Sequence, residues 1–105
     1  MLTSGTRAAE RAEVAKRVEE IRQEFARDVV RIRFDVDEDW TGVPAIFFRV
    51  LLTDRASRGE KRRRTTKAVA ERLRQEPLFD DFGARAYFNF RNVSEQAELK
   101  DPEWA

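Results

Sequence analysis

Apolar residues along the chain follow two different periods, and each change of period marks the start of a new predicted element. Between residues 6 and 28 the apolar side chains recur every three to four positions, as Val14, Val18, Ile21 and Phe25. That spacing predicts an amphipathic helix. From residue 30 the period becomes two, and Val30, Ile32, Phe34 and Val36 alternate with charged residues. This alternation predicts a half-buried strand.

The rest of the chain repeats the same two patterns. Residues 44–53 predict a second strand, and the short connection around Gly42 favours an antiparallel hairpin. A helix is predicted over 60–75, with Thr66, Val69 and Leu73 as its apolar stripe, and Pro77 follows its end. Residues 84–92 alternate again and predict a third strand. Ser94 is a candidate N-cap for a short last helix.

These elements give the order α-β-β-α-β. We expect a single α+β domain over residues 1–105, built as a two-layer sandwich with a three-stranded sheet and two helices on one face. Residues 94–105 would form a short C-terminal helix and tail. The third strand could lie beside either of the other two.

The element order is similar to that of KH-type ribosome-assembly factors, which bind RNA. The G-x-x-G loop of KH RNA binding is missing, because Gly5, Gly42, Gly59 and Gly83 are all isolated. The resemblance therefore implies RNA binding through other surfaces, namely the sheet face and the basic start of the second helix.

Composition excludes several classes of chemistry. The chain has 105 residues, 21 Lys and Arg against 20 Asp and Glu, and neither Cys nor His. Disulfides, thiol or Ser-His catalysis and zinc sites built on thiolate or imidazole are therefore ruled out. No apolar run is long enough to cross a bilayer, and the first residues do not resemble an export signal. We expect a cytoplasmic protein without a cofactor, a membrane contact or a small-molecule substrate.

One face of the predicted sheet carries an unusual mixture of charged and aromatic groups. If the helices cover the face of Ile32, Phe48 and Phe90, the opposite face has five Arg and two Asp, a local balance of +3 in a chain of net charge +1. Its binding candidates are Arg31, Arg33, Phe47, Arg49, Leu51, Arg85, Tyr87, Asn89 and Arg91. Trp40 at the hairpin tip and Trp104 in the tail are candidate anchors for a partner.

Three interpretations of this face stay open. Aromatic and Arg side chains are enriched at the centre of protein interfaces. Single-stranded nucleic acid needs the same two groups, for base stacking and for phosphate contact. Alternatively, long Arg stems cover Phe47 and Leu51, and the face binds nothing.

The predicted second helix begins with six cations in ten residues, a second candidate for anion binding. They oppose the positive end of the helix dipole, and only Glu60 complements it. Arg62, Arg63, Arg64 and Lys67 are the candidate phosphate contacts. Pairing with Glu residues of the first helix is the simpler explanation.

Asp35, Asp37 and Asp39 lie at alternate positions and could hold a divalent cation on a continuing strand. Turn-forming aspartates beside Gly42 explain the cluster more simply, so no metal or catalytic residue is assigned. The sequence thus predicts a small non-enzymatic interaction subunit, accessory or antitoxin-like. It would bind a partner protein or a second copy through the sheet face, with RNA or single-stranded nucleic acid as the alternative ligand.

Overall fold

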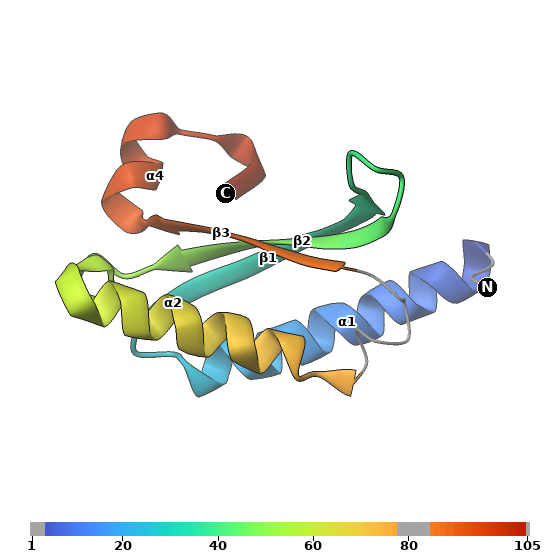
Figure 1. Ribbon diagram of the computed structural model, residues 1–105, viewed down its shortest axis with the longest axis horizontal. Coiled ribbons are helices and arrows are strands. Elements are labelled where there is room, and N and C mark those ends of the chain that lie inside the picture. Colours follow the sequence, from blue (N-terminus) through green and yellow to red (C-terminus); the bar gives the residue numbers. More distant parts are fainter. Residues whose placement is uncertain (1–3, 78–84, 105) are drawn as a thin grey trace.

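The computed structural model describes residues 4–77 and 85–104, with side chains from residue 11 onward. Within these ranges it contains three α-helices and a three-stranded sheet, so the predicted α+β class is confirmed (Figure 1). The elements are α1 (Ser4–Glu24), β1 (Val29–Glu38), β2 (Pro44–Leu52), the 3-10 turn η1 (Arg55–Ser57), α2 (Gly59–Arg74), β3 (Arg85–Asn92), α4 (Val93–Leu99) and the 3-10 turn η2 (Pro102–Trp104).

The sheet is mixed, with β2 at its centre. β1 pairs with β2 in the antiparallel direction, as predicted for the hairpin, and β3 lies parallel to β2 on its other side. This answers the question of where the third strand lies. It also leaves β1 and β3 as the two edges of the sheet.

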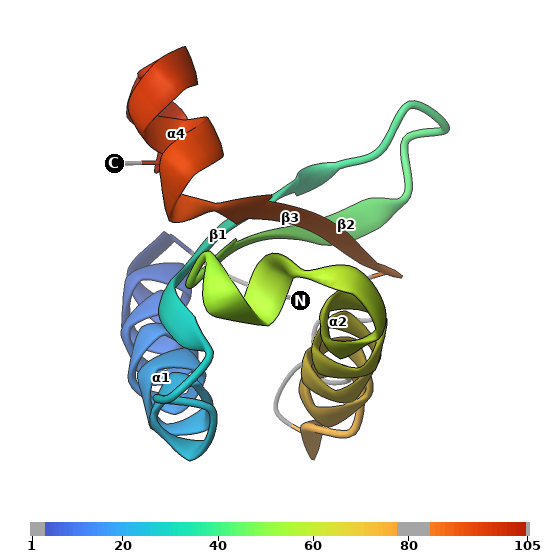
Figure 2. The same cartoon turned by 90° about the vertical axis from the view of Figure 1, so that its left-hand side faces the viewer.

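Helices α1 and α2 lie on one face of the sheet, where the main hydrophobic core forms (Figure 2). α1 buries the predicted stripe of Val14, Val18 and Ile21 against it, while Phe25 is partly buried. From the sheet, Ile46, Phe48, Val50 and Leu52 of the central strand are almost inaccessible to solvent. None of the described helices is long and apolar enough to cross a membrane.

Two predicted core positions are wrong by one residue. β1 carries a bulge between Val29 and Arg31, so Val29 is fully buried and Val30 is 41% exposed. The bulge inserts an extra residue and changes which side chain faces the core. In α2 the buried threonine is Thr65 rather than Thr66.

The C-terminal tail (93–104, comprising α4 and η2) crosses to the other face of the sheet, which the sequence left open (Figures 1 and 2). Its helix begins at Val93, with an N-cap two residues earlier than expected. Asn92, not Ser94, is the N-cap, with Glu95 completing a capping box. Ser94 instead donates its backbone N–H to Asp54 at 3.0 Å, which ties the tail to the loop after β2.

Candidate interaction surface

The face of the sheet opposite α1 and α2, called here the distal face, displays the residues predicted to form the open surface. The strand register arranges them in rows across the sheet. From the tail end towards the hairpin these rows are Arg31–Leu51–Arg91, Arg33–Arg49–Asn89, Asp35–Phe47–Tyr87 and Asp37–Ala45–Arg85.

The tail covers the first of these rows. Trp104 is only 7% exposed, and Leu51 beneath the tail is 6% exposed. The Arg91 guanidinium lies 4.4 Å from the centre of the Trp104 ring, and Arg31 donates to the Trp104 carbonyl oxygen at 3.3 Å. The expectation that Leu51 is exposed is therefore wrong, because the chain docks its own tryptophan there.

Arg91 also organises the tail internally. Its guanidinium donates to the side-chain oxygen of Gln96 at 2.8 Å and lies 3.6 Å from the carboxylate of Asp101. Gln96 in turn donates to the Asp101 carbonyl oxygen at 2.7 Å. Two of the five arginines on the distal face, Arg31 and Arg91, are thus used to hold the tail.

In the second row, Arg33 lies directly opposite Arg49, a pairing of like charges. A neighbouring carboxylate offsets it, because Arg49 contacts Asp35 at 2.7 Å. Arg49 also donates to the carbonyl oxygen of Glu103 at 2.9 Å, so a third arginine engages the tail. Arg33 and Asn89 remain exposed, and Arg33 has no hydrogen-bond or ion-pair partner among the described residues.

Beyond the tail, three rings form an aromatic trio of Trp40, Phe47 and Tyr87. Phe47 and Tyr87 stack with their centroids 5.2 Å apart and their planes at 16°, and Trp40 tilts against Tyr87 at 5.6 Å. Phe47 and Tyr87 are half-buried, while Trp40 is 82% exposed. The trio therefore presents a supported tryptophan to solvent.

Asp39 holds the hairpin loop that carries Trp40. Its carboxylate accepts from the Thr41 N–H at 2.9 Å, the Thr41 hydroxyl at 2.6 Å, the Val43 N–H at 3.1 Å and the Tyr87 hydroxyl at 2.9 Å. These donors, led by the Thr41 hydroxyl, lower the pKa of Asp39 to about 2. Gly42, at φ +82°, closes the turn in a conformation that favours glycine.

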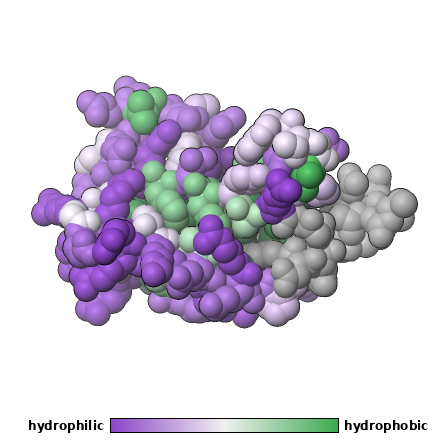
Figure 3. Space-filling view, in the orientation of Figure 1, coloured by the Kyte–Doolittle hydropathy of each residue, from purple (hydrophilic) through white to green (hydrophobic). Residues whose placement is uncertain are grey.

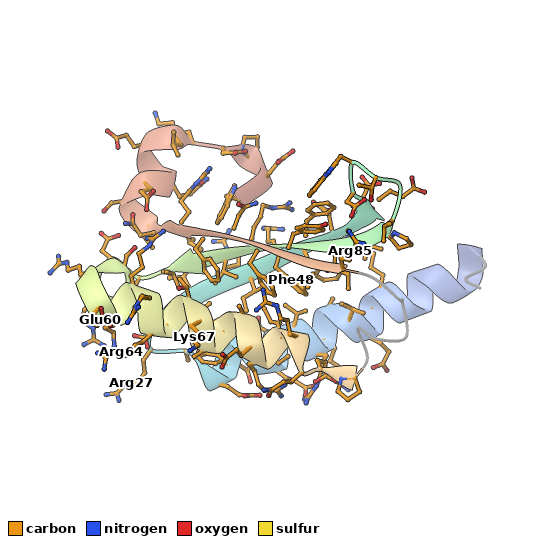
Figure 4. The ribbon with its side chains drawn as sticks, viewed as in Figure 1. Arg27, Phe48, Glu60, Arg64, Lys67 and Arg85 are labelled. Carbon is orange, nitrogen blue, oxygen red and sulfur yellow. The ribbon has the colours of Figure 1, made fainter. Side chains whose placement is uncertain are left out.

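The rim of the aromatic trio carries both signs of charge. Arg85 approaches the Asp39 carboxylate at 3.6 Å but keeps 59% of its side chain exposed (Figure 4). Asp37 and Glu38, at the end of β1, are exposed on the same hairpin.

The cations at the start of α2 divide into paired and unpaired groups. Lys61 contacts Asp28 at 3.3 Å, Arg62 hydrogen-bonds the Ser57 hydroxyl, and Arg63 contacts Glu60 at 2.7 Å. Among the residues that the structure describes, no partner is found for the exposed side chains of Arg27, Arg64 and Lys67. Arg58 interacts electrostatically with Asp54 and helps to lower the pKa of that carboxyl group. Arg27 comes from the turn after α1, which the Lys61–Asp28 ion pair joins to α2; Figure 4 labels Arg27 and Arg64.

The aspartates of β1 do not gather into a metal site. Asp35 pairs with Arg49 and Asp39 serves the hairpin, so their carboxylates have separate partners. Across residues 4–77 and 85–104, no group of three or more acidic side chains is placed to hold a metal ion.

A hydrophobic band is visible between β3 and α2 in the space-filling view (Figure 3). Ala86, Phe88 and Phe90 of this edge strand are partly buried against the core. The guanidinium of Arg74 lies 4.8 Å from the Phe88 ring centre and covers part of it. The band is therefore a partly shielded margin of the core.

Comparison with protein-family models, curated proteins and solved structures finds no match for this chain. The functional argument therefore rests on geometry. Sequence reasoning singled out Trp40, Phe47, Arg85 and Tyr87, which the structure brings together at the hairpin end. It interpreted the aspartates beside Gly42 as turn-forming, which Asp39 is, but it missed that Asp39 also accepts a hydrogen bond from the Tyr87 hydroxyl.

Proposed function

We propose that this protein is a non-enzymatic interaction subunit, acting in the cytoplasm, that binds a partner protein through the aromatic trio and its rim. The observation that carries this proposal is the exposure of Trp40, which is 82% accessible although two stacked rings support it. Tryptophan, tyrosine and arginine are the residues that contribute most to binding energy at protein interfaces. Here they stand together on a strand-and-hairpin scaffold.

The charges around the trio favour a protein over a nucleic acid as its ligand. Three arginines of the distal face already bond to the tail, through the carbonyls of Trp104 and Glu103 and the side chains of Gln96 and Asp101. Carboxylates remain exposed at the hairpin, on Asp37 and Glu38. A phosphate backbone would be repelled by these acids, whereas a protein surface can match a rim of mixed charge.

The support under Trp40 suits it to act as an anchor. A side chain that is already ordered loses less conformational entropy on binding than a free one. The Tyr87 hydroxyl is tied to Asp39, and the Tyr87 ring contacts both Phe47 and Trp40. We expect the partner to place an apolar group on the Trp40 ring.

A photo-crosslinking side chain at the exposed Glu38, which leaves the hydrogen bonds between Asp39 and Thr41 in place, tests the proposal. Crosslinking in cells identifies the polypeptide that meets the hairpin, and the purified partner is then titrated against variants. Trp40→Ala should weaken binding by about 30-fold or more, the range of an interface hot spot. Leu99→Ala is the matched control, because Leu99 is also an exposed apolar residue (61%) but lies in the tail. Equal affinity of both variants for the partner would contradict the proposal.

Nucleic acid is a second candidate ligand, at a different surface. The unpaired cations Arg27, Arg64 and Lys67 favour it, because their exposed side chains are free to contact phosphates. Binding of single-stranded RNA should weaken steeply between about 50 and 200 mM salt. Replacing Arg64 and Lys67 by Gln should reduce that salt dependence, while Trp40→Ala should leave it unchanged. Absence of binding at low salt would eliminate this candidate.

A further inference from the structure

A groove of about 630 Å³ runs along the free edge of β1, on a different surface from the aromatic trio. One wall is α1, with Arg11, Ala15, Val18 and Glu19, and the other is the tail, with Pro102 and Glu103. Residues 32–35 of β1 lie between them. The groove therefore borders a sheet edge whose outer backbone groups pair with no strand in the described part of the chain.

Every second residue of β1 directs its N–H and C=O groups away from β2, as in any antiparallel pair. The carbonyl oxygen of Phe34 accepts from an exposed α1 side chain, Arg11, at 3.5 Å, which places residues 32, 34 and 36 in this outward set. Long edge strands with free backbone groups are normally protected against pairing. Here the strand has ten residues, and its side chains Val30 and Val36 are 41% and 37% exposed.

The charges along one β1 strand are complementary to those along a second, antiparallel copy of the same strand. On the distal face, β1 reads Arg31, Arg33, Asp35, Asp37. If a second β1 runs antiparallel with Phe34 facing its own copy, each Arg33 faces an Asp35 and each Arg31 faces an Asp37. On the other face, Ile32 then lies opposite Val36 of the second copy. Opposite charges and β-branched apolar pairs across strands both stabilise a sheet.

This pairing is better than its nearest alternatives. Moving the centre to residue 33 sets Arg33 against Arg33, and moving it to residue 35 sets Asp35 against Asp35. The arrangement centred on Phe34 has four opposite-charge pairs and no like pair. It also pairs outward residues with outward residues, so the backbone hydrogen bonds can form. The monomer leaves Arg33 without a partner in the described chain, and this arrangement supplies one.

We propose that the free edge of β1 is a self-association site, at which two copies of this chain pair their β1 strands antiparallel around Phe34 to form a continuous six-stranded sheet. The occupant of the groove is thus a second copy. The Arg11 side chain, 53% exposed and 3.7 Å from Asp35, swings aside, and the N–H of Phe34 in the second copy replaces it at the Phe34 carbonyl.

The oligomeric state of the full chain, followed by sedimentation across a range of concentrations, tests the proposal. The unmodified protein should sediment as a dimer that dissociates on dilution. Arg33→Asp turns two attractive pairs into repulsive ones and should raise the dissociation constant about tenfold or more. The double variant Arg33→Asp with Asp35→Arg restores opposite charges between copies and should recover the dimer. It also keeps a carboxylate beside Arg49, because position 33 lies directly opposite that residue.

Arg64→Asp is the matched control, since it makes the same charge change on an exposed, unpaired arginine of α2, a helix that does not line the groove. It should leave the dimer intact. A monomeric mass at concentrations up to about 1 mM would overturn the proposal, as would a dimer indifferent to Arg33→Asp. A dimer lost in the single variant and not recovered in the double variant would overturn the pairing around Phe34. None of these outcomes depends on Trp40, so the proposed function is tested separately.

Discussion

Replacing Trp104 by Ala should release the tail from the distal face without unfolding the core. Trp104 is the buried end of a tail whose helix α4 has no buried residue of its own. Its ring contacts Arg91, and its carbonyl oxygen accepts from Arg31. The indole therefore supplies most of the apolar contact that holds residues 93–104 in place.

The size of the effect follows from the burial of the ring. A buried aromatic side chain removes about 150–250 Å² from water, which at about 25 cal/mol per Å² gives an upper bound of about 4–6 kcal/mol. Measured Trp→Ala costs in cores are about 3–5 kcal/mol. Loss of 3 kcal/mol would increase tail opening about 100-fold, since each 1.4 kcal/mol is a factor of ten. The free-energy cost of Trp104→Ala cannot exceed the free energy with which the tail docks on the sheet, because side chain 104 makes no contact with the sheet once the tail has undocked.

Hydrogen exchange measures this opening directly. The amides of Lys100 and Trp104 donate to Gln96 and Asp101 in the folded tail, at 2.8 and 3.1 Å. In Trp104→Ala they should exchange about 100-fold faster, while the amides of β2 keep their protection. Trp40→Ala is the matched control, because it removes the same side chain from an exposed position. Unchanged protection of α4 in Trp104→Ala would refute the assignment of Trp104 as the tail's anchor.

Three further changes test other parts of the structure. The pKa of Asp39, about 2, lies below the ordinary value of 3.8. The stabilisation of the hairpin by the Asp39 carboxylate should therefore be complete above about pH 4 and disappear as the pH falls towards 2. The chemical shift of the Thr41 amide, measured by NMR across this range, checks the prediction. Val29→Ala should lower the free energy of unfolding by about 2 kcal/mol in urea titrations, whereas Val30→Ala should change it by less than about 0.5 kcal/mol; equal effects would contradict the bulge. Glu76→Gln removes a nearly buried carboxylate that contacts two arginines. It should lower the free energy of unfolding by about 2 kcal/mol in the same urea titration. An unchanged free energy of unfolding would mean that solvent screens these contacts.

The fold class and the core were predictable because they depend on periodicity. The stripe of Val14, Val18 and Ile21 and the alternation in β2 each require only local spacing, and both bury as expected. The one-residue error at Val29 and Val30 has a physical cause. A bulge depends on how two strands pair across the hairpin, and the alternation of a single strand carries no record of it.

The destination of the tail was not predictable from its own sequence. An isolated Trp104 near the end of a chain has no periodic partners, so nothing local says which surface will bury it. The pairing depends on Leu51 and Arg91, which lie side by side only once β3 pairs with β2. The same holds for Asp39, whose bond to Tyr87 joins residues 48 positions apart.

The arginines of the distal face show why a charged sheet surface is an ambiguous signal. The last carbonyl groups of a helical turn have no partner within that turn and need donors from elsewhere. Arg31 and Arg49 supply them to Trp104 and Glu103. A guanidinium has five donors and can serve a carbonyl and a carboxylate at once, as Arg49 does with Glu103 and Asp35. Arginine beside exposed aromatic residues therefore indicates a partner for the sheet, and here the first partner is the chain's own C-terminal end.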